Sequence, residues 1–138
     1  MKKSTLCVIV AMVICSLLGL VIVSCDQATG PDFGGAEFAG IWVQDEVLAV
    51  ETLTITTTTF ELEDTGMFEG TMKCSITSYD ETANHIQMTT TSVTGIWTLL
   101  GTGIVLYVTY SISGDEMYMD WDTSAYPASA TGGPYIKQ

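Results

Sequence analysis

Positive charge is scarce in this sequence. Its 138 residues contain four lysines and no arginine against sixteen acidic residues, and the net charge is −12 at pH 7. Proteins that bind nucleic acids neutralise phosphates with lysine and arginine, so this composition excludes that class of function. A surface of this charge favours cationic partners and is repelled by anionic lipid headgroups. Acidity also keeps a domain soluble, which is the more ordinary reason for it.

The residues that carry most enzyme chemistry are few as well. The only histidine is His85, which has no cysteine nearby for a zinc site. No serine lies in a G-x-S-x-G motif. Carboxylates that share one face of a strand are expected on its solvated side: Glu61, Glu63, Asp64, Asp120 and Asp122. We therefore expect no catalytic residues, no metal, no cofactor and no enzymatic activity.

The first residues have the layout of a secretory signal. Lys2 and Lys3 give the N-terminus a positive charge, an apolar run covers residues 6–23, and the small residue Ser24 precedes Cys25. The run is also about the minimum length of a membrane-spanning helix, so an uncleaved anchor is the alternative. Both interpretations export residues 26–138 and leave them attached to a membrane.

The ending Ile22-Val23-Ser24-Cys25 resembles the lipobox of bacterial lipoproteins, in which a small residue precedes the cysteine. The resemblance implies cleavage between Ser24 and Cys25, lipidation of the Cys25 thiol and acylation of its new amino group. It also implies a lipid-anchored protein of the bacterial cell envelope, with the lipid bilayer as the partner of the acylated Cys25. Which membrane and which face carry it stays open.

The chain is expected to have three parts. Residues 1–24 are the signal peptide, residues 25–39 are the lipidated cysteine with a flexible tether rich in glycine, and residues 40–138 are the domain. Beyond the signal there are sixteen acidic residues and two lysines, which gives a net charge of −14. Cys74 is then the only thiol besides Cys25, so no disulfide within the domain is expected.

Period-two alternation predicts an all-β domain. It is clearest from Phe68 to Thr77, where even-numbered residues share one face. Cys74 lies on that face, so we expect a buried, structural thiol. Eight strands are predicted at residues 40–44, 50–56, 59–64, 67–77, 84–92, 95–100, 103–113 and 116–122. Tyr135-Ile136 is a candidate for a closing strand.

Gly40-Ile41-Trp42 resembles the G-x-W opening of lipocalins and their calycin relatives. The Tyr110–Met117 hairpin is similar to the last turn of small lipocalin-like bacterial lipoproteins. The resemblance implies a small antiparallel up-and-down β-barrel of about eight strands, which could carry a small apolar ligand. Trp42, Trp97 and Tyr107 are the candidate ligand-binding residues.

Two functions follow from the side chains expected inside the barrel. These are mostly bulky: Phe68, Met72, Ile76, Met88, Leu106, Val108, Tyr110, Ile112, Met117, Met119 and Trp121. They predict a filled interior with at most a shallow pocket at one mouth, near Trp97 or Tyr107. A filled barrel favours a non-enzymatic binding or interaction module for a protein partner. The alternative is a carrier of a small apolar ligand, with methionines as an adaptable lining.

Overall fold

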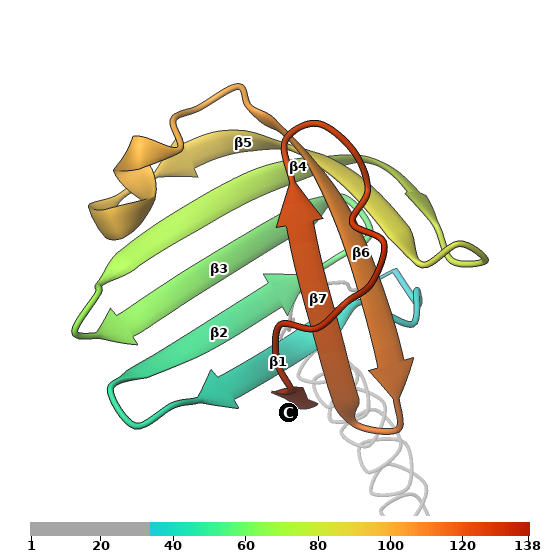
Figure 1. The fold of residues 1–138 in the computed structure, drawn as a ribbon, viewed down its shortest axis with the longest axis horizontal. Helices are drawn as coiled ribbons and strands as arrows, with labels where there is room; N and C mark the ends of the chain where they lie inside the picture. The colour runs from blue at the N-terminus through green and yellow to red at the C-terminus, as the bar shows by residue number, and fades with distance from the viewer. Residues whose placement is uncertain (1–33) are drawn as a thin grey trace, which may run out of the picture. The chain divides into compact units, whose positions relative to one another are not determined.

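The computed structural model describes residues 34–138, which form a closed antiparallel barrel of eight strands (Figure 1). Each strand pairs with the next one in the chain, and the last strand pairs with both the seventh and the first. The elements are β1 (Gly40–Asp45), β2 (Ala49–Ile55), β3 (Thr59–Gly66), β4 (Gly70–Asp80), β5 (His85–Val93), the 3₁₀ helix η1 (Gly95–Leu99), β6 (Val105–Ser113), β7 (Glu116–Asp122) and β8 (Tyr135–Lys137). The prediction of an all-β, lipocalin-like up-and-down barrel is confirmed. Within this part of the chain no helix is long and apolar enough to cross a membrane.

One predicted strand is wrong. Residues 95–100 contain η1, and the eighth strand of the barrel is β8, the candidate closing strand. Gly95 has a φ of +59°, a conformation that favours glycine. A Cβ at Gly95 would overlap the Glu69 carbonyl oxygen, so glycine is also needed for this close approach. The chain therefore turns at Gly95 instead of continuing as a strand.

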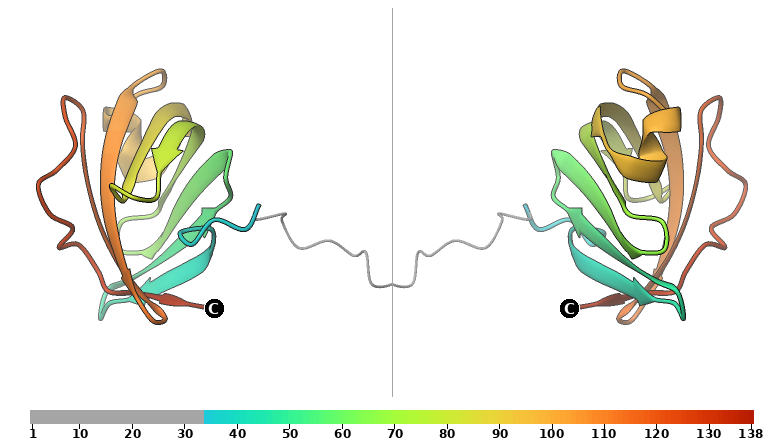
Figure 2. Two further views of the ribbon diagram at one scale, coloured as in Figure 1. Left: turned by 90° about the vertical axis from the view of Figure 1, so that its right-hand side faces the viewer. Right: turned by 90° about the vertical axis from the view of Figure 1, so that its left-hand side faces the viewer.

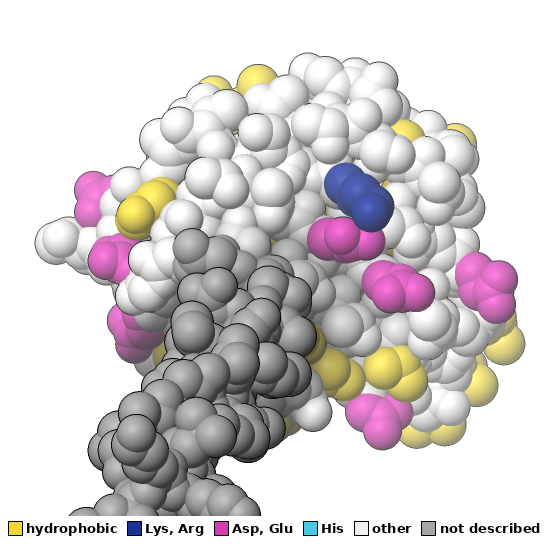
Figure 3. Space-filling model, turned by 180° about the vertical axis from the view of Figure 1, so that it is seen from behind, with side chains coloured by type: hydrophobic (Ala, Val, Ile, Leu, Met, Phe, Trp, Pro, Cys, Tyr) yellow, Lys and Arg dark blue, Asp and Glu magenta, His cyan; other side chains and the backbone are white. Residues whose placement is uncertain are grey.

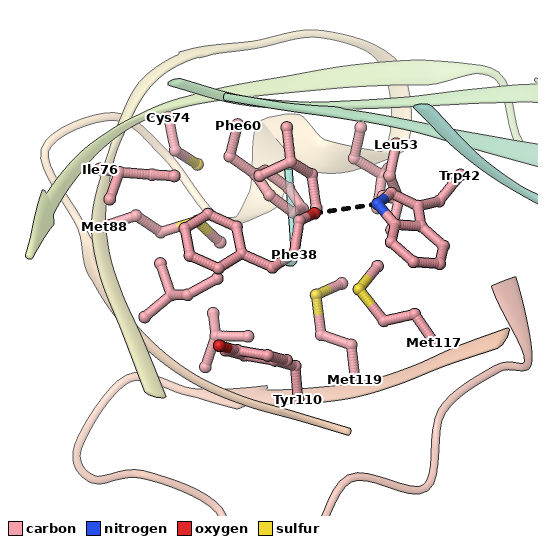
Figure 4. Packing of buried hydrophobic residues seen from close by; sticks show 14 of the residues in the cluster. Phe38, Trp42, Leu53, Phe60, Cys74, Ile76, Met88, Tyr110, Met117 and Met119 are labelled. Carbon is pink, nitrogen blue, oxygen red and sulfur yellow. Dashed lines mark hydrogen bonds between the residues drawn. The ribbon is translucent and has the colours of Figure 1, made fainter. Parts of the chain in front are cut away.

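The core fills the inside of the barrel and follows the expected alternation (Figure 4). Inward residues are odd-numbered on β2 and even-numbered on β3, as Leu53 and Phe60 show. The change of phase falls in the turn at Thr56, whose hydroxyl oxygen accepts hydrogen bonds from the Thr58 and Thr59 amides at 3.1 and 2.9 Å. The buried apolar residues are Phe38, Ala39, Trp42, Leu53, Ile55, Phe60, Leu62, Met72, Cys74, Ile76, Ile86, Met88, Leu106, Val108, Tyr110, Met117, Met119 and Tyr135.

Three of the predicted inward residues are not in this core. Phe68 is 56% exposed because it lies in the turn between β3 and β4. Trp121 is 37% exposed because it is the second-last residue of β7, where the strand ends. Ile112 is only half-buried and packs against the core from its edge. Alternation placed Ile112 and Trp121 on the correct face, but a face near a strand end is not enclosed. It was wrong for Phe68, which lies outside the strands.

One end of the barrel is closed by residues that precede β1. Phe38 has no exposed surface, and its ring packs edge-on against Tyr79 and Tyr110 with centroids 5.1 and 5.6 Å away. The indole nitrogen of Trp42 donates a hydrogen bond of 2.9 Å to the Phe38 carbonyl oxygen (Figure 4). We call this the plugged end. Residues 36–39, which the sequence analysis assigned to the tether, thus belong to the barrel.

The chain reaches β8 by running along the outside of the barrel, as Figure 2 shows for residues 123–134. Tyr126 stacks on His85 at 3.9 Å and meets Tyr107 edge-on at 5.2 Å. The Thr109 hydroxyl donates to the Pro127 carbonyl oxygen at 2.7 Å. These contacts hold the connection against β5 and β6, so that β8 can pair between β7 and β1.

Candidate functional site

The three candidate ligand-binding residues lie in three different surroundings. Trp42 is fully buried in the core and bonded to Phe38. Trp97 lies in η1, with its ring 6.3 Å from that of Trp121. Tyr107 points out of the barrel and lies under Tyr126. The structure does not bring the three together, and their role in ligand binding stays a prediction. The processing site at Ser24 and Cys25 lies outside the described residues.

A group of polar side chains lies inside the barrel at the end opposite to the plug. The Tyr135 hydroxyl donates a hydrogen bond of 2.6 Å to Glu51 Oε2. The Trp97 indole nitrogen donates one of 2.8 Å to Asp64 Oδ2. Glu51 and Asp64 are paired across β2 and β3, so that the Glu51 carboxylate acts electrostatically on Asp64. These contacts link β2, β3, η1 and β8 through four side chains, which we call the carboxyl cluster.

Asp64 is the buried member of this carboxyl pair. Only 7% of its surface is exposed, and its Oδ1 atom is covered and accepts no hydrogen bond within the described residues. Burial raises the pKa of Asp64, and the nearby Glu51 carboxylate raises it further, while the Trp97 hydrogen bond acts in the opposite direction. Burial and the proximity of Glu51 both favour the protonated form of Asp64.

Burial also raises the pKa of the Tyr135 phenol, and the hydrogen bond to Glu51 adds to this effect. The Tyr135 phenol therefore stays protonated and donates a hydrogen bond to Glu51. The carboxyl cluster thus contains two hydrogen bonds, from Tyr135 to Glu51 and from Trp97 to Asp64, while Asp64 Oδ1 accepts none within the described residues.

The position of Asp64 corrects the expectation of a solvated carboxylate. The signal was present in the phase of the strand, because Phe60 and Leu62 are inward and Asp64 follows at the same parity. Glu51 likewise precedes Leu53 and Ile55 on the inward face of β2. The other carboxylates lie outside the barrel, where Glu61 pairs with Lys73 at 3.0 Å. The Thr131 amide and hydroxyl both donate hydrogen bonds to Asp120 Oδ2, at 2.7 and 2.8 Å.

Two carboxyl groups held close together are also an arrangement used in acid–base catalysis. Here the Asp64 oxygen that faces no donor is covered. The hollow next to it, about 470 Å³ in volume, includes Asp64 in its lining but not Glu51. A substrate in that hollow would not lie between the two carboxyl groups. The geometry therefore supports a structural role, in which the carboxyl cluster closes this end of the barrel.

Two hollows are open on the surface. The first is bordered by acidic and hydroxyl side chains and two glycines: Glu63, Asp64, Thr65, Glu69, Gly70, Thr71, Thr94 and Gly95. The second, about 370 Å³, lies between β7 and the outer connection, from Asp120 to Ser129. Neither is lined by the apolar core. In residues 34–138 no group of three His, Cys, Asp or Glu side chains is placed to hold a metal ion.

Cys74 lies in the core as predicted, with 3% of its surface exposed. Burial raises the pKa of its thiol to about 12, so the reactive thiolate is suppressed. Burial likewise raises the pKa of Tyr110 to about 12, helped by the negative charges of Glu81, Glu37 and Asp80. Both groups are therefore neutral at physiological pH and serve as packing residues.

Comparison with known proteins adds no relative: no family model matches the chain, and no curated protein or solved structure matches it. The class is therefore defined by the fold, which is a small lipocalin-like barrel of eight antiparallel strands. It is plugged at one end by Phe38 and closed at the other by the carboxyl cluster.

Proposed function

We propose that this chain is an exported lipoprotein, anchored in the bacterial cell envelope through Cys25, whose barrel is a non-enzymatic interaction module. The observation that carries the proposal is the filled interior. Trp42, Met72 and Leu106 have no exposed surface, and neither open hollow reaches the core. Interiors packed in this way leave no space for a ligand. Recognition is then left to the outer surface.

The charge of the domain supports the same proposal. Both lysines of the described region are engaged, Lys73 with Glu61 and Lys137 over the Trp42 ring at 5.0 Å from its centre. The remaining charged surface is acidic. A surface of one sign speeds association with partners of the opposite sign and repels anionic lipids. The module would therefore meet a cationic partner in front of the membrane rather than the membrane itself.

Native mass spectrometry distinguishes the interaction module from a carrier of a small apolar ligand. Residues 26–138, which contain the whole barrel, would be exported behind a cleavable signal and purified without detergent. We expect the mass of the bare polypeptide, because the interior is already filled. A small apolar molecule that copurifies in stoichiometric amount would refute the interaction module and establish the carrier.

The anchor is tested by labelling cells with radioactive palmitate. We expect label on the full chain and on the Cys74→Ala variant, but none on the Cys25→Ala variant, which should also keep its signal. The Cys74→Ala variant controls for acylation at the other cysteine of the exported part. Persistent label on the Cys25→Ala variant would refute lipidation at Cys25.

A further inference from the structure

Most of the exposed large apolar side chains of the barrel lie at one end. They belong to the β1–β2 turn, the β3–β4 turn and η1, which all project at the left of Figure 1. This apolar rim consists of Val47, Leu48, Met67, Phe68, Ile96 and Leu99. Val47 and Leu99 are almost fully exposed, at 100% and 94%, and none of the six is less than 44% exposed. Exposed apolar groups that cluster in this way mark interaction sites.

The rim is one continuous and rigid surface. The Met67 amide donates a hydrogen bond of 3.1 Å to the Leu48 carbonyl oxygen, which joins the first two turns. The Ile96 amide donates one of 3.2 Å to the Glu69 carbonyl oxygen, which joins the second turn to η1. Glycines allow these backbones to approach, since a Cβ at Gly66 would overlap the Leu48 carbonyl oxygen. A preorganised surface loses little entropy when a partner binds.

The charges around the rim are all negative. Glu63 and Glu69 line the 470 Å³ hollow beside it, and Asp45 and Glu46 flank the β1–β2 turn. Figure 3, seen from behind, shows acidic side chains next to hydrophobic ones along the right-hand edge of the molecule. The lysines of the described region are engaged elsewhere, with Glu61 and over Trp42.

We propose that the apolar rim and the acidic hollow beside it form the docking surface for a protein partner whose contacting segment is basic and apolar. Apolar side chains of the partner pack on Phe68, Val47 and Leu99, and a lysine or arginine enters the hollow between Glu63 and Glu69. This inference rests on the proposed interaction module and names the surface and the partner chemistry.

Charge decides between this partner and the two other occupants of an exposed apolar surface. A second copy would bring a second acidic rim against the first, and like charges across an interface cost binding energy. A bilayer with anionic lipids would be repelled for the same reason.

The partner chemistry is tested by selecting binders to residues 26–138 from a displayed library of random peptides. We expect the selected peptides to combine lysine or arginine with aromatic or aliphatic residues. The best of them should bind the Val47→Ser/Phe68→Ser/Leu99→Ser variant at least about tenfold more weakly, equal to about 1.4 kcal/mol. Ile136→Ser is the matched control, because Ile136 is an exposed apolar residue on β8, and it should leave affinity unchanged.

The contribution of the acidic side chains beside the rim is tested with a second pair of variants. Glu63→Gln/Glu69→Gln should weaken the same peptide and reduce the salt dependence of its binding. Asp115→Asn/Glu116→Gln makes an equal change of charge in the β6–β7 turn and should not. All four proteins should give the same circular dichroism spectrum and melting temperature, because the changed side chains are exposed.

Several results would overturn the docking surface. Selected peptides that are acidic, or that bind the triple rim variant as tightly as the unchanged chain, would do so. A dimer in sedimentation that the rim substitutions abolish would assign the rim to a second copy. Binding to phosphatidylcholine vesicles that the same substitutions abolish would assign it to a membrane. None of these failures adds a small apolar molecule to the native mass spectrum of the barrel, so they are distinct from a failure of the interaction module.

Discussion

Cys74 and Asp64 are two of the ionisable side chains that the barrel encloses, and burial changes the chemistry of both. The Cys74 thiol is surrounded by the core and has its pKa raised to about 12. Asp64 lies at the end of the barrel opposite to the plug, where Glu51 and Trp97 are its partners. The Cys74 thiol is thereby made unreactive. The ionisation of Asp64 makes the stability of the barrel depend on pH.

Cys74 should react slowly with a thiol reagent while the barrel is folded. The thiolate is the reacting species, and both burial and the raised pKa keep it scarce. The matched control is Cys74→Ala/Ser75→Cys, which moves the thiol to the next residue of β4, where the side chain is exposed. Reaction with Ellman's reagent should be fast for the control and for the denatured chain. Equal rates for both folded proteins would contradict the burial of Cys74.

Asp64→Asn should gain stability relative to the unchanged chain as the pH rises. The folded-state pKa of Asp64 is raised above its ordinary value of about 3.9, so its favourable contribution is complete below that value and is lost as the pH rises through the folded-state pKa. Asparagine cannot ionise and has nearly the size and shape of aspartic acid. A tenfold tighter binding of this proton by the folded state corresponds to about 1.4 kcal/mol of stability.

The measurement is the free energy of unfolding by urea between about pH 4 and pH 8. The control is Glu63→Gln, which removes a carboxylate from the neighbouring, outward position of β3. The control should show no comparable rise with pH. A constant difference between the Asp64→Asn variant and the unchanged chain over this range would mean that Asp64 is not buried.

The 3₁₀ helix η1 closes the rim end of the barrel, although it buries none of its residues completely. Its position depends on Gly70 and Gly95, where the backbone approaches a carbonyl oxygen too closely for a side chain. A Cβ at Gly70 would lie 2.7 Å from the Thr94 carbonyl oxygen, and one at Gly95 would overlap the Glu69 carbonyl oxygen. Thr90, on the inside of β5, fixes the following loop, because its hydroxyl donates to the Gly101 carbonyl oxygen at 2.9 Å.

Gly95→Ala should therefore destabilise the barrel more than a change of backbone preference alone explains. The variant combines strain at a φ of +59° with an overlap against Glu69. Gly101→Ala is the matched control, since Gly101 also has a positive φ, of +82°, but has nothing within 4 Å of the added Cβ. Thermal unfolding should show a loss of about 1 kcal/mol for the control, and a clearly larger loss for Gly95→Ala.

Equal losses for the two glycine variants would show that η1 moves without cost. In that case the rim would be less rigid than the hydrogen bonds between its turns indicate. Fluorescence of Trp97 provides a second readout, because its indole leaves Asp64 when η1 shifts.

At the scale of the whole molecule, the barrel is a closed shell around packed side chains. The short strand β8 closes it, because it pairs with Trp42 and Val43 of β1 and with Glu116 and Met117 of β7. Closure of this kind shortens the unpaired edges through which threonine-rich strands would associate. The packed core therefore supports the shell.

Leu106→Ala should cost about 2–5 kcal/mol of unfolding free energy, as is usual for fully buried leucines. Leu99→Ala makes the same chemical change in η1, where the leucine is 94% exposed, and should stay within about 0.5 kcal/mol of the unchanged chain. Urea titration measures both. A loss for Leu106→Ala as small as that for Leu99→Ala would mean that the interior is not tightly packed, which would favour the carrier.

The sequence by itself determined strands β1 to β7 and their inward faces. Alternation is a local property, because successive side chains of a strand point to opposite faces whatever the strand pairs with. Met72, Cys74 and Ile76 were for this reason placed in the core correctly. The same rule extended by one step, from Leu62 to Asp64, would have placed the buried carboxyl group as well.

Only the tertiary structure decided how the barrel is closed. Phe38 plugs one end, although it stands in a glycine-rich stretch with no periodicity. At the other end Tyr135 donates to Glu51 across a sequence separation of 84 residues, and η1 replaces a strand because Gly95 lies against Glu69. These contacts join residues that are far apart in the chain. Their formation depends on which turns meet in space, and no local pattern records that.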